Sequence, residues 1–443
     1  MDNELNQEVS DNRLMTMFQR YLAKNKPNDK LLKRFRLCGS QQADVGLIKK
    51  STVVMSNGKH SHFIGLARCN NSWACPVCTA KKMAEYGGRI ACAIDALSTQ
   101  YNQYAVMVTF TLPHTKNMSC WESLEILHDT WFKFANSSIS KMKRKYKLKD
   151  GTEKTYYTDS GRNAFSKMRV ELNIKHLVRV FEVTYGEDNG WHPHIHALLW
   201  IPKENFNKVV DYEESLNELW WRCAKRVAKK FYTEKHIAEY LYPDYKKATK
   251  DGHKSVYISR NKDGKPRIQK SSNYLIDGWS GDLELTGSYK QKTARNGHYT
   301  PRQLLVRAYE NPNERDKLLK LYAEYARATS GRKRVNFSNT GINDIVKNWK
   351  SSHEYIESLK KKYMDKVAAP FKLVTWFTEE QWLAITILDR EIYIRAKILE
   401  LAKLPDGKVR ITDELLKYNI DIRNNPEHPD KELLESYHSK LAA

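Results

Sequence analysis

The sequence lacks a long hydrophobic run. Of its 443 residues 29% are charged, and no segment has the roughly 20 consecutive apolar residues that a membrane-spanning helix needs. The N-terminal stretch MDNELNQEVSDNR is polar and acidic, unlike the basic and apolar regions of a signal peptide. We therefore expect a soluble, cytoplasmic protein with no membrane partner.

Several sequence motifs are absent too. No GxxxxGK[ST] segment occurs, so the chain has no P-loop and no recognisable helicase motor. The absence of HExxH argues against a zinc protease. No repeat of fixed period occurs, which argues against a repeat architecture.

The net charge is large and is unevenly distributed along the chain. The formal net charge is +23, yet residues 341–443 contain 17 Lys and Arg and 17 Asp and Glu. The whole positive excess therefore belongs to residues 1–340. A polyanion is the expected partner, and nucleic acid is favoured over an acidic membrane because no basic amphipathic anchor stands out. The neutral end would be a helicase-docking or self-association module, or a helical cap.

Strand and helix patterns alternate along the chain, which favours an α+β fold on an antiparallel sheet. We expect a strand at 103–111 and hairpins at 177–200 and 252–270, the second turning at Asp263–Gly264. Helices are expected at 121–146, 211–231, 317–332 and, as one long amphipathic stretch, 379–403. The expected domains are a polar tail (1–30), a cysteine-rich zinc-binding segment (31–95), a catalytic domain (96–310) and a mostly helical C-terminal region (311–443).

The segment WHPHIHALLW, residues 191–200, carries two closely spaced histidines. In a strand, alternation places His194 and His196 on one face, with Ile195 on the other. Paired imidazoles on a rigid strand can hold a metal ion. For an isolated pair, the ordinary interpretation is two polar residues on the wet face of a strand.

The preceding segment adds a carboxylate. LVRVFEVTY is rich in strand formers, and the following GEDNG is typical of a turn. A turn centred on Asp188 pairs position 182 with position 194, which places Glu182 opposite His194 on the same face. A register slip of one residue would leave Glu182 as a solvated residue on the other face. The hairpin thus predicts a site of two histidines and one glutamate.

Four of the seven cysteines form a second candidate site. Cys75 and Cys78 form a CxxC knuckle, Cys69 is a third ligand, and Cys38 is the best fourth. A redox CxxC or buried thiols is the alternative. Four thiolates would close a structural zinc site and leave no position for substrate.

A His/His/Glu site in a strongly basic protein suggests phosphodiester chemistry, which requires an attacking group. The chain has 25 tyrosines. Tyr274, in SSNYLIDGWS, follows the second hairpin where a helix could start. Tyr240, in HIAEYLYPDY, lies in a helical stretch. The residues alone do not choose between them.

These pieces together resemble the replication initiators of rolling-circle plasmids and phages, a branch of the HUH endonucleases. The resemblance covers roughly residues 35–310. It rests on the cysteine cluster and on VMVTFTLPHT, FEVTYG…GWHPHIHALL and SSNYLIDGWSGDLELTGSYKQKTARNGHYTPRQLL, in that order.

The resemblance implies that His194, His196 and the acidic Glu182 bind Mg²⁺ or Mn²⁺, and that Tyr274 is the nucleophile. In the family a lysine usually follows the tyrosine by three residues. Here Asp277 occupies that position and Lys270 lies four residues before the tyrosine, so Tyr240 stays an alternative.

The implied activity is nicking of one strand of plasmid origin DNA, presented single-stranded or as a hairpin. The nick leaves a 5′-phosphotyrosine link and a free 3′-OH primer, and the strand is later rejoined. Host helicase, single-strand-binding protein and DNA polymerase are the implied partners. The alternatives are a relaxase or single-tyrosine transposase, a non-catalytic zinc-containing DNA-binding regulator, and a zinc hydrolase.

Overall fold

The computed structural model divides the chain into two compact units. It describes residues 11–43, 51–136, 141–148, 150–159, 163–234, 237, 254–269, 297–337, 341–352 and 371–442. Unit 1 comprises Met1–Lys82, Arg302–Ser330 and His353–Ala443, and unit 2 comprises Met83–Pro301 and Gly331–Ser352. Each unit combines segments far apart in the sequence, so the division differs from the consecutive domains that the sequence predicts.

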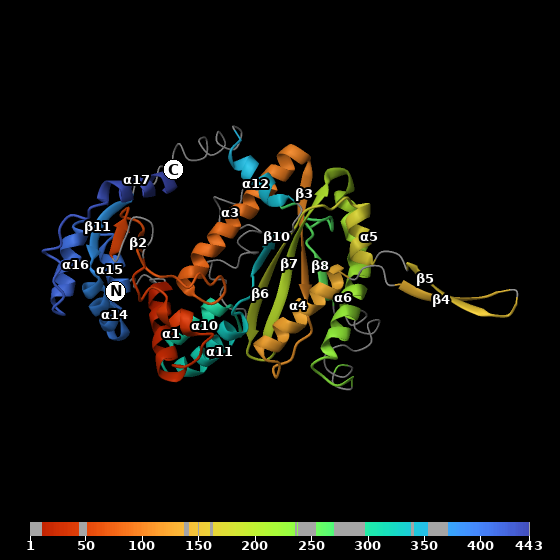
Figure 1. Cartoon of the computed structure of the whole chain (residues 1–443), viewed down its shortest axis with the longest axis horizontal. Helices are drawn as coiled ribbons and strands as arrows, with labels where there is room; N and C mark the ends of the chain where they lie inside the picture. Colours follow the sequence, from red (N-terminus) through yellow and green to blue (C-terminus); the bar gives the residue numbers. More distant parts are fainter. Residues whose placement is uncertain are drawn as a thin grey trace. The chain divides into compact units, whose positions relative to one another are not determined.

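Unit 2 is built on a six-stranded antiparallel sheet with helices around it (Figure 1). The strand order is β10-β6-β7-β3-β8, and β9 pairs with β6. Its strands are β3 (Gln103–Thr111), β6 (Leu177–Gly186), β7 (Gly190–Pro202), β8 (Val256–Ile258), β9 (His298–Tyr299) and β10 (Val335–Phe337). Its helices are α4 (Cys120–Asn136), α5 (Ala164–Glu171), η1 (Lys203–Tyr212), α6 (Glu213–Ala228) and α12 (Ile342–Lys350). A separate two-stranded sheet pairs β4 (Lys141–Lys147) with β5 (Glu153–Asp159).

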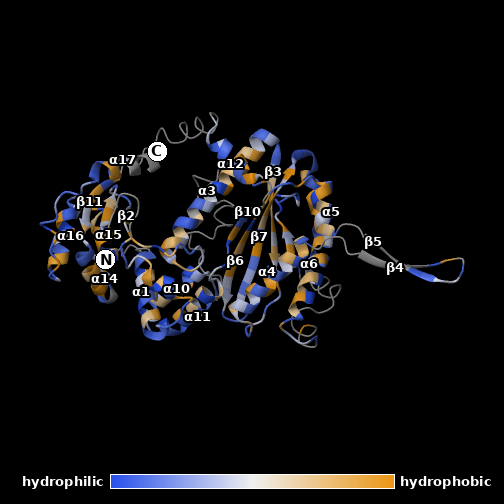
Figure 2. Cartoon of the chain, in the orientation of Figure 1, coloured by the Kyte–Doolittle hydropathy of each residue, from blue (hydrophilic) through white to orange (hydrophobic). Residues whose placement is uncertain are grey.

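One face of the large sheet is covered by α4 and α6. Phe110 of β3 lies 5.3 Å from Trp131 of α4 and 5.0 Å from Trp220 of α6, measured between ring centroids. Hydrophobic colouring follows the central strands in Figure 2, as expected for strands with buried side chains. Since neighbours in a strand alternate, Thr109 belongs to the opposite face.

Unit 1 contains a three-stranded antiparallel sheet in the order β11-β1-β2. Its strands are β1 (Thr52–Ser56), β2 (Ser61–Ile64) and β11 (Lys372–Phe377), and its helices are α1 (Asp11–Asn25), α2 (Lys33–Leu37), α10 (Pro301–Glu310), α11 (Arg315–Ala328), α14 (Glu379–Ile392), α15 (Ile394–Leu401), α16 (Gly407–Leu416) and α17 (Lys431–Ala442). The helix α3 (Pro76–Tyr101) begins in unit 1 and continues into unit 2. Within the described part of the chain, no helix is both long and apolar enough to cross a bilayer.

Several helices in the structure differ from those that the sequence predicts. Residues 11–25 are a helix rather than part of a tail, because Leu14, Phe18 and Leu22 recur every four residues and are fully buried. The helix expected at 121–146 ends at Asn136, and β4 follows. The stretch 379–403 is broken at Tyr393, whose φ of 58° ends α14. The second hairpin turns as predicted, with the Asn261 amide donating to the Lys265 carbonyl at 2.9 Å.

A buried ion pair joins the N- and C-terminal segments of unit 1. Arg395 Nε donates to Asp389 Oδ2 at 2.7 Å, and the two side chains are 8% and 1% exposed. Thr16 Oγ1 donates to the same carboxylate at 2.6 Å, and Arg395 Nη1 donates to the Gly39 carbonyl at 2.9 Å. The pair therefore connects α1, α14 and the chain next to Cys38.

Replacing Asp389 with alanine is expected to destabilise unit 1 by about 3–5 kcal/mol, because it leaves the Arg395 guanidinium buried without its counter-charge. Chemical denaturation followed by far-UV circular dichroism measures the change. The matched control is Asp421→Ala, which removes the exposed partner of Arg423 and is expected to change stability little. Equal stability of the Asp389 variant and the parent would contradict this assignment.

Candidate metal centre

The β6–β7 hairpin brings together the three residues that the sequence predicts. Gly190 has a φ of 77° and pairs with Gly186 where the strands join, a conformation that favours glycine. From this turn the register pairs Glu182 with His194 and Val180 with His196. The predicted hairpin register is confirmed, and all three polar side chains belong to one face of the sheet.

The three donor atoms converge closely. The Nε2 atoms of His194 and His196 lie 3.0 Å and 3.1 Å from the same oxygen, Oε2 of Glu182. Neighbouring ligands at right angles around a cation with bonds of about 2.1 Å are about 3.0 Å apart. The spacing therefore fits a small divalent cation.

The charge state of the group also suits a cation. Burial by itself raises the pKa of Glu182, but the hydrogen bonds and charges of His194 and His196 outweigh it and hold that pKa well below its usual value. The carboxylate is therefore ionised at neutral pH. The Glu182 and His194 side chains keep 17% and 13% exposure, so the centre is partly open.

The other ring nitrogens of the histidines are engaged as well. Thr109 Oγ1 lies 3.0 Å from His196 Nδ1, and β3 pairs Thr109 directly with His196. His194 Nδ1 lies 3.4 Å from the carbonyl of His192. The His192 carbonyl can only accept a hydrogen bond, so it favours a proton on Nδ1 of His194, and the Thr109 hydroxyl orients the His196 ring. Sequence patterns predict the strand of Thr109 but not that it pairs with β7.

Thr109→Val is expected to weaken Mn²⁺ binding by about 10–100-fold, because it removes the oxygen that orients His196. Isothermal titration with Mn²⁺ measures the affinity. Thr109→Ser keeps the hydroxyl and should restore binding, and Thr412→Val, a buried threonine of α16, is the control. Unaltered Mn²⁺ affinity in Thr109→Val would show that this contact does not position the ligand.

Two further histidines adjoin the centre. The rings of His114 and His192 stack at 4.5 Å between centroids, and His192 shares the strand face of His194. Burial, with the nearby histidine charges, lowers the pKa of His192 to about 3, and burial also lowers that of His114. Both rings are therefore neutral at pH 7. Neither was singled out from sequence, although the HPHIH pattern places His192 in the same register as the two predicted ligands.

The predicted nucleophiles cannot be placed against this centre. Tyr274 and Tyr240 both lie outside the described residues, as do Lys270 and Asp277.

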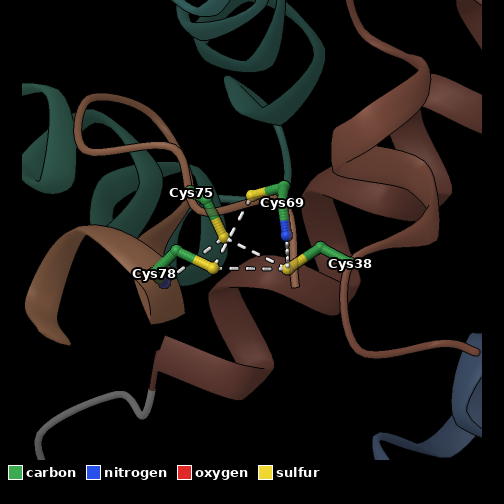
Figure 3. A group of neighbouring side chains, drawn as sticks. All are labelled: Cys38, Cys69, Cys75 and Cys78. Carbon is green, nitrogen blue, oxygen red and sulfur yellow. Dashed lines mark hydrogen bonds between the residues drawn. The ribbon is translucent and has the colours of Figure 1, made fainter. Parts of the chain in front are cut away.

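The four predicted cysteines form a second group, in unit 1 (Figure 3). Cys38 Sγ lies 3.6 Å from the sulfurs of Cys75 and Cys78, and Cys69 Sγ lies 3.6 Å from that of Cys78. A tetrahedron with metal–sulfur bonds of about 2.3 Å has edges of about 3.8 Å. Both groups of side chains are therefore compatible with metal binding.

Local structure brings the cysteines together. Cys38 follows α2, Cys75 precedes α3, and Cys78 lies in the first turn of α3. The Asn71 side chain accepts hydrogen bonds from the amides of Trp73 and Ala74 and so shapes the loop before the knuckle. Burial raises the pKa of the Cys75 thiol well above its usual value, so a cation is needed to keep this thiolate ionised.

Comparison with known proteins gives two relatives. The chain is 24% identical over 309 residues to "Protein rep" of Streptomyces lividans, covering 62% of this chain and 63% of the relative. It is 29% identical over 139 residues to "Neomycin resistance protein" of Streptomyces cyanogenus, covering 31% of each. The chain thus spans less than two thirds of the length of either relative. No protein-family model and no solved structure matches the chain.

Proposed function

We propose that the chain is a replication initiator that nicks one strand of plasmid origin DNA and later rejoins it. The observation that carries the proposal is the convergence of Glu182, His194 and His196 on one face of a rigid hairpin. The name of the Streptomyces lividans relative and the net charge of +23 support a role in replication and a DNA substrate. The antiparallel sheet is consistent with an HUH endonuclease fold.

By the resemblance to HUH endonucleases the three ligands would hold Mg²⁺ or Mn²⁺, and the four cysteines suit a structural Zn²⁺. When bound, the divalent cation would supply a Lewis acid beside a phosphate oxygen. Thr109 and the His192 carbonyl orient the two imidazoles, and Glu182 contributes the negative charge. Fixed donors of this kind need no rearrangement during the reaction.

In the proposed reaction the phenolate oxygen of Tyr274 attacks the scissile phosphorus. A bond forms between the tyrosine oxygen and the phosphorus, and the bond from phosphorus to the 3′ oxygen breaks. The leaving 3′ oxygen takes a proton from solvent, which balances the proton that the tyrosine lost to solvent. The products are a 5′-phosphotyrosine link and a 3′-OH primer. Because the ester keeps the bond energy, the reverse attack rejoins the strand without ATP. Host helicase, single-strand-binding protein and polymerase are the proposed partners.

The test is formation of a covalent adduct. Single-stranded oligonucleotides tiling the origin of the replicon that encodes the chain are incubated with protein and Mn²⁺ and run on a denaturing gel. We expect an Mn²⁺-dependent adduct that Tyr274→Phe abolishes and Tyr240→Phe retains. The opposite pattern would assign the nucleophile to Tyr240.

Other outcomes separate the alternatives. Tight DNA binding with no adduct under any metal condition would favour the non-catalytic regulator over the nicking enzyme. Strand transfer at the ends of a mobile element, rather than nicking at an origin, would favour a transposase.

A further inference from the structure

The hairpin of β4 and β5 stands apart from the large sheet of unit 2 (Figure 1). Its seven residue pairs run from Lys141 opposite Asp159 to Lys147 opposite Glu153, and no other strand joins this sheet among the described residues. The turn is closed by the Leu148 amide, which donates to the Thr152 carbonyl at 2.9 Å, and Gly151 has a φ of 84°. A two-stranded hairpin alone is marginally stable in water, so a binding partner would stabilise it.

The hairpin is strongly basic, and its lysines are regularly spaced. Residues 141–159 contain seven Lys and Arg and three Asp and Glu. Strand alternation places Lys141, Lys143, Lys145 and Lys147 at positions of one face, in a row with a repeat of about 6.6–6.8 Å. The other face has Arg144 directly opposite Tyr156 and Tyr146 opposite Lys154.

Double-stranded DNA is a partner that matches this arrangement of basic and aromatic residues on the hairpin. The major groove, about 12 Å wide, admits a two-stranded ribbon, and phosphates repeat every 3.4 Å of axis along each strand. A row of lysines along one strand of the ribbon can contact phosphates of a DNA strand that borders the groove. Arg and Tyr on the other face are residue types that contact DNA bases and phosphates.

We propose that the β4–β5 hairpin binds a groove of duplex DNA and anchors the protein beside its cleavage site. This assignment rests on the proposed function for its cleavage site, but the binding itself does not require nicking. In this proposal the hairpin anchors duplex DNA, whereas the Glu182/His194/His196 centre would act on an unpaired strand.

The test compares full-length proteins on a 30-base-pair duplex of arbitrary sequence and on one of its strands, over a salt series. Lys143→Ala/Lys145→Ala/Lys147→Ala is expected to weaken duplex binding and to reduce the slope of log Kd against log salt by about 2.7. Between about 50 and 200 mM salt the parent would then lose roughly 40-fold more affinity than the variant. Binding to the single strand is expected to change less.

Two matched variants control for charge and folding. Lys350→Ala/Lys403→Ala/Lys408→Ala removes three exposed lysines elsewhere and should bind duplex like the parent. Replacing the three hairpin lysines with arginine should keep the slope. An unchanged slope in the hairpin variant, an equal loss in the control, or a loss confined to the single strand would each overturn the proposal. Because the readout is binding, a failure to nick would overturn the proposed function and leave this result standing.

Discussion

A chain carrying His194→Ala and His196→Ala is expected to lose tight Mn²⁺ binding and, with it, strand cleavage. Both imidazoles contact one oxygen of Glu182 at 3.0–3.1 Å, so their removal leaves a single carboxylate ligand. Changes to residues that only orient a ligand cost about 10–100-fold in metal affinity, so losing two ligands should exceed 100-fold. Titration calorimetry with Mn²⁺ and the adduct assay measure the two effects.

Two further variants sharpen this experiment. Glu182→Gln keeps the shape of the side chain but removes the charge, and it should weaken Mn²⁺ binding while the sheet stays folded. His60→Ala, at an exposed histidine of unit 1, is the control for loss of an imidazole. Parent-like Mn²⁺ affinity in the double histidine variant would contradict the metal centre.

Cys75→Ser is expected to release the proposed zinc ion and unfold unit 1. The Cys75 side chain is fully buried, and the Tyr322 and Tyr325 hydroxyls of α11 donate to the neighbouring carbonyls of Ala74 and Trp73 at 2.6 Å and 3.1 Å. Loss of the cluster therefore disturbs the packing of α11. Structural zinc contributes about 10–16 kcal/mol in zinc-finger peptides, whereas whole domains are stable by only about 5–15 kcal/mol.

Elemental analysis and thermal melting test this prediction. The parent should carry one zinc per chain, and Cys75→Ser should carry none and lose a cooperative transition. Cys223→Ser, at a buried cysteine of unit 2, should keep the zinc. A Cys75→Ser chain that melts like the parent would show that the cluster is not a structural metal site.

The local parts of the site could be predicted from sequence. Alternation and the GEDNG turn were sufficient to pair Glu182 with His194, because a hairpin register depends only on nearby residues. The knuckle spacing predicts the cysteine group, and Cys38 lies with the other three cysteines in the structure. These interpretations needed no knowledge of how distant segments meet.

The long-range parts of the site could not be predicted from sequence. Thr109 reaches His196 only because β3 pairs with β7, and β1 pairs with β11 across more than three hundred residues. Neither pairing can be detected from the hydrophobic pattern of a single segment. The same limit applies to residues 353–443 and the cysteine segment, which are far apart in the sequence although both belong to unit 1.

The most direct measurement is anomalous diffraction from crystals of the full chain soaked in Mn²⁺. We expect one manganese peak within coordination distance of Glu182 and of the Nε2 atoms of His194 and His196, with the Tyr274 hydroxyl facing the ion. The absence of manganese between these three residues in a well-soaked crystal would contradict this expectation, and manganese faced by Tyr240 instead would reassign the nucleophile.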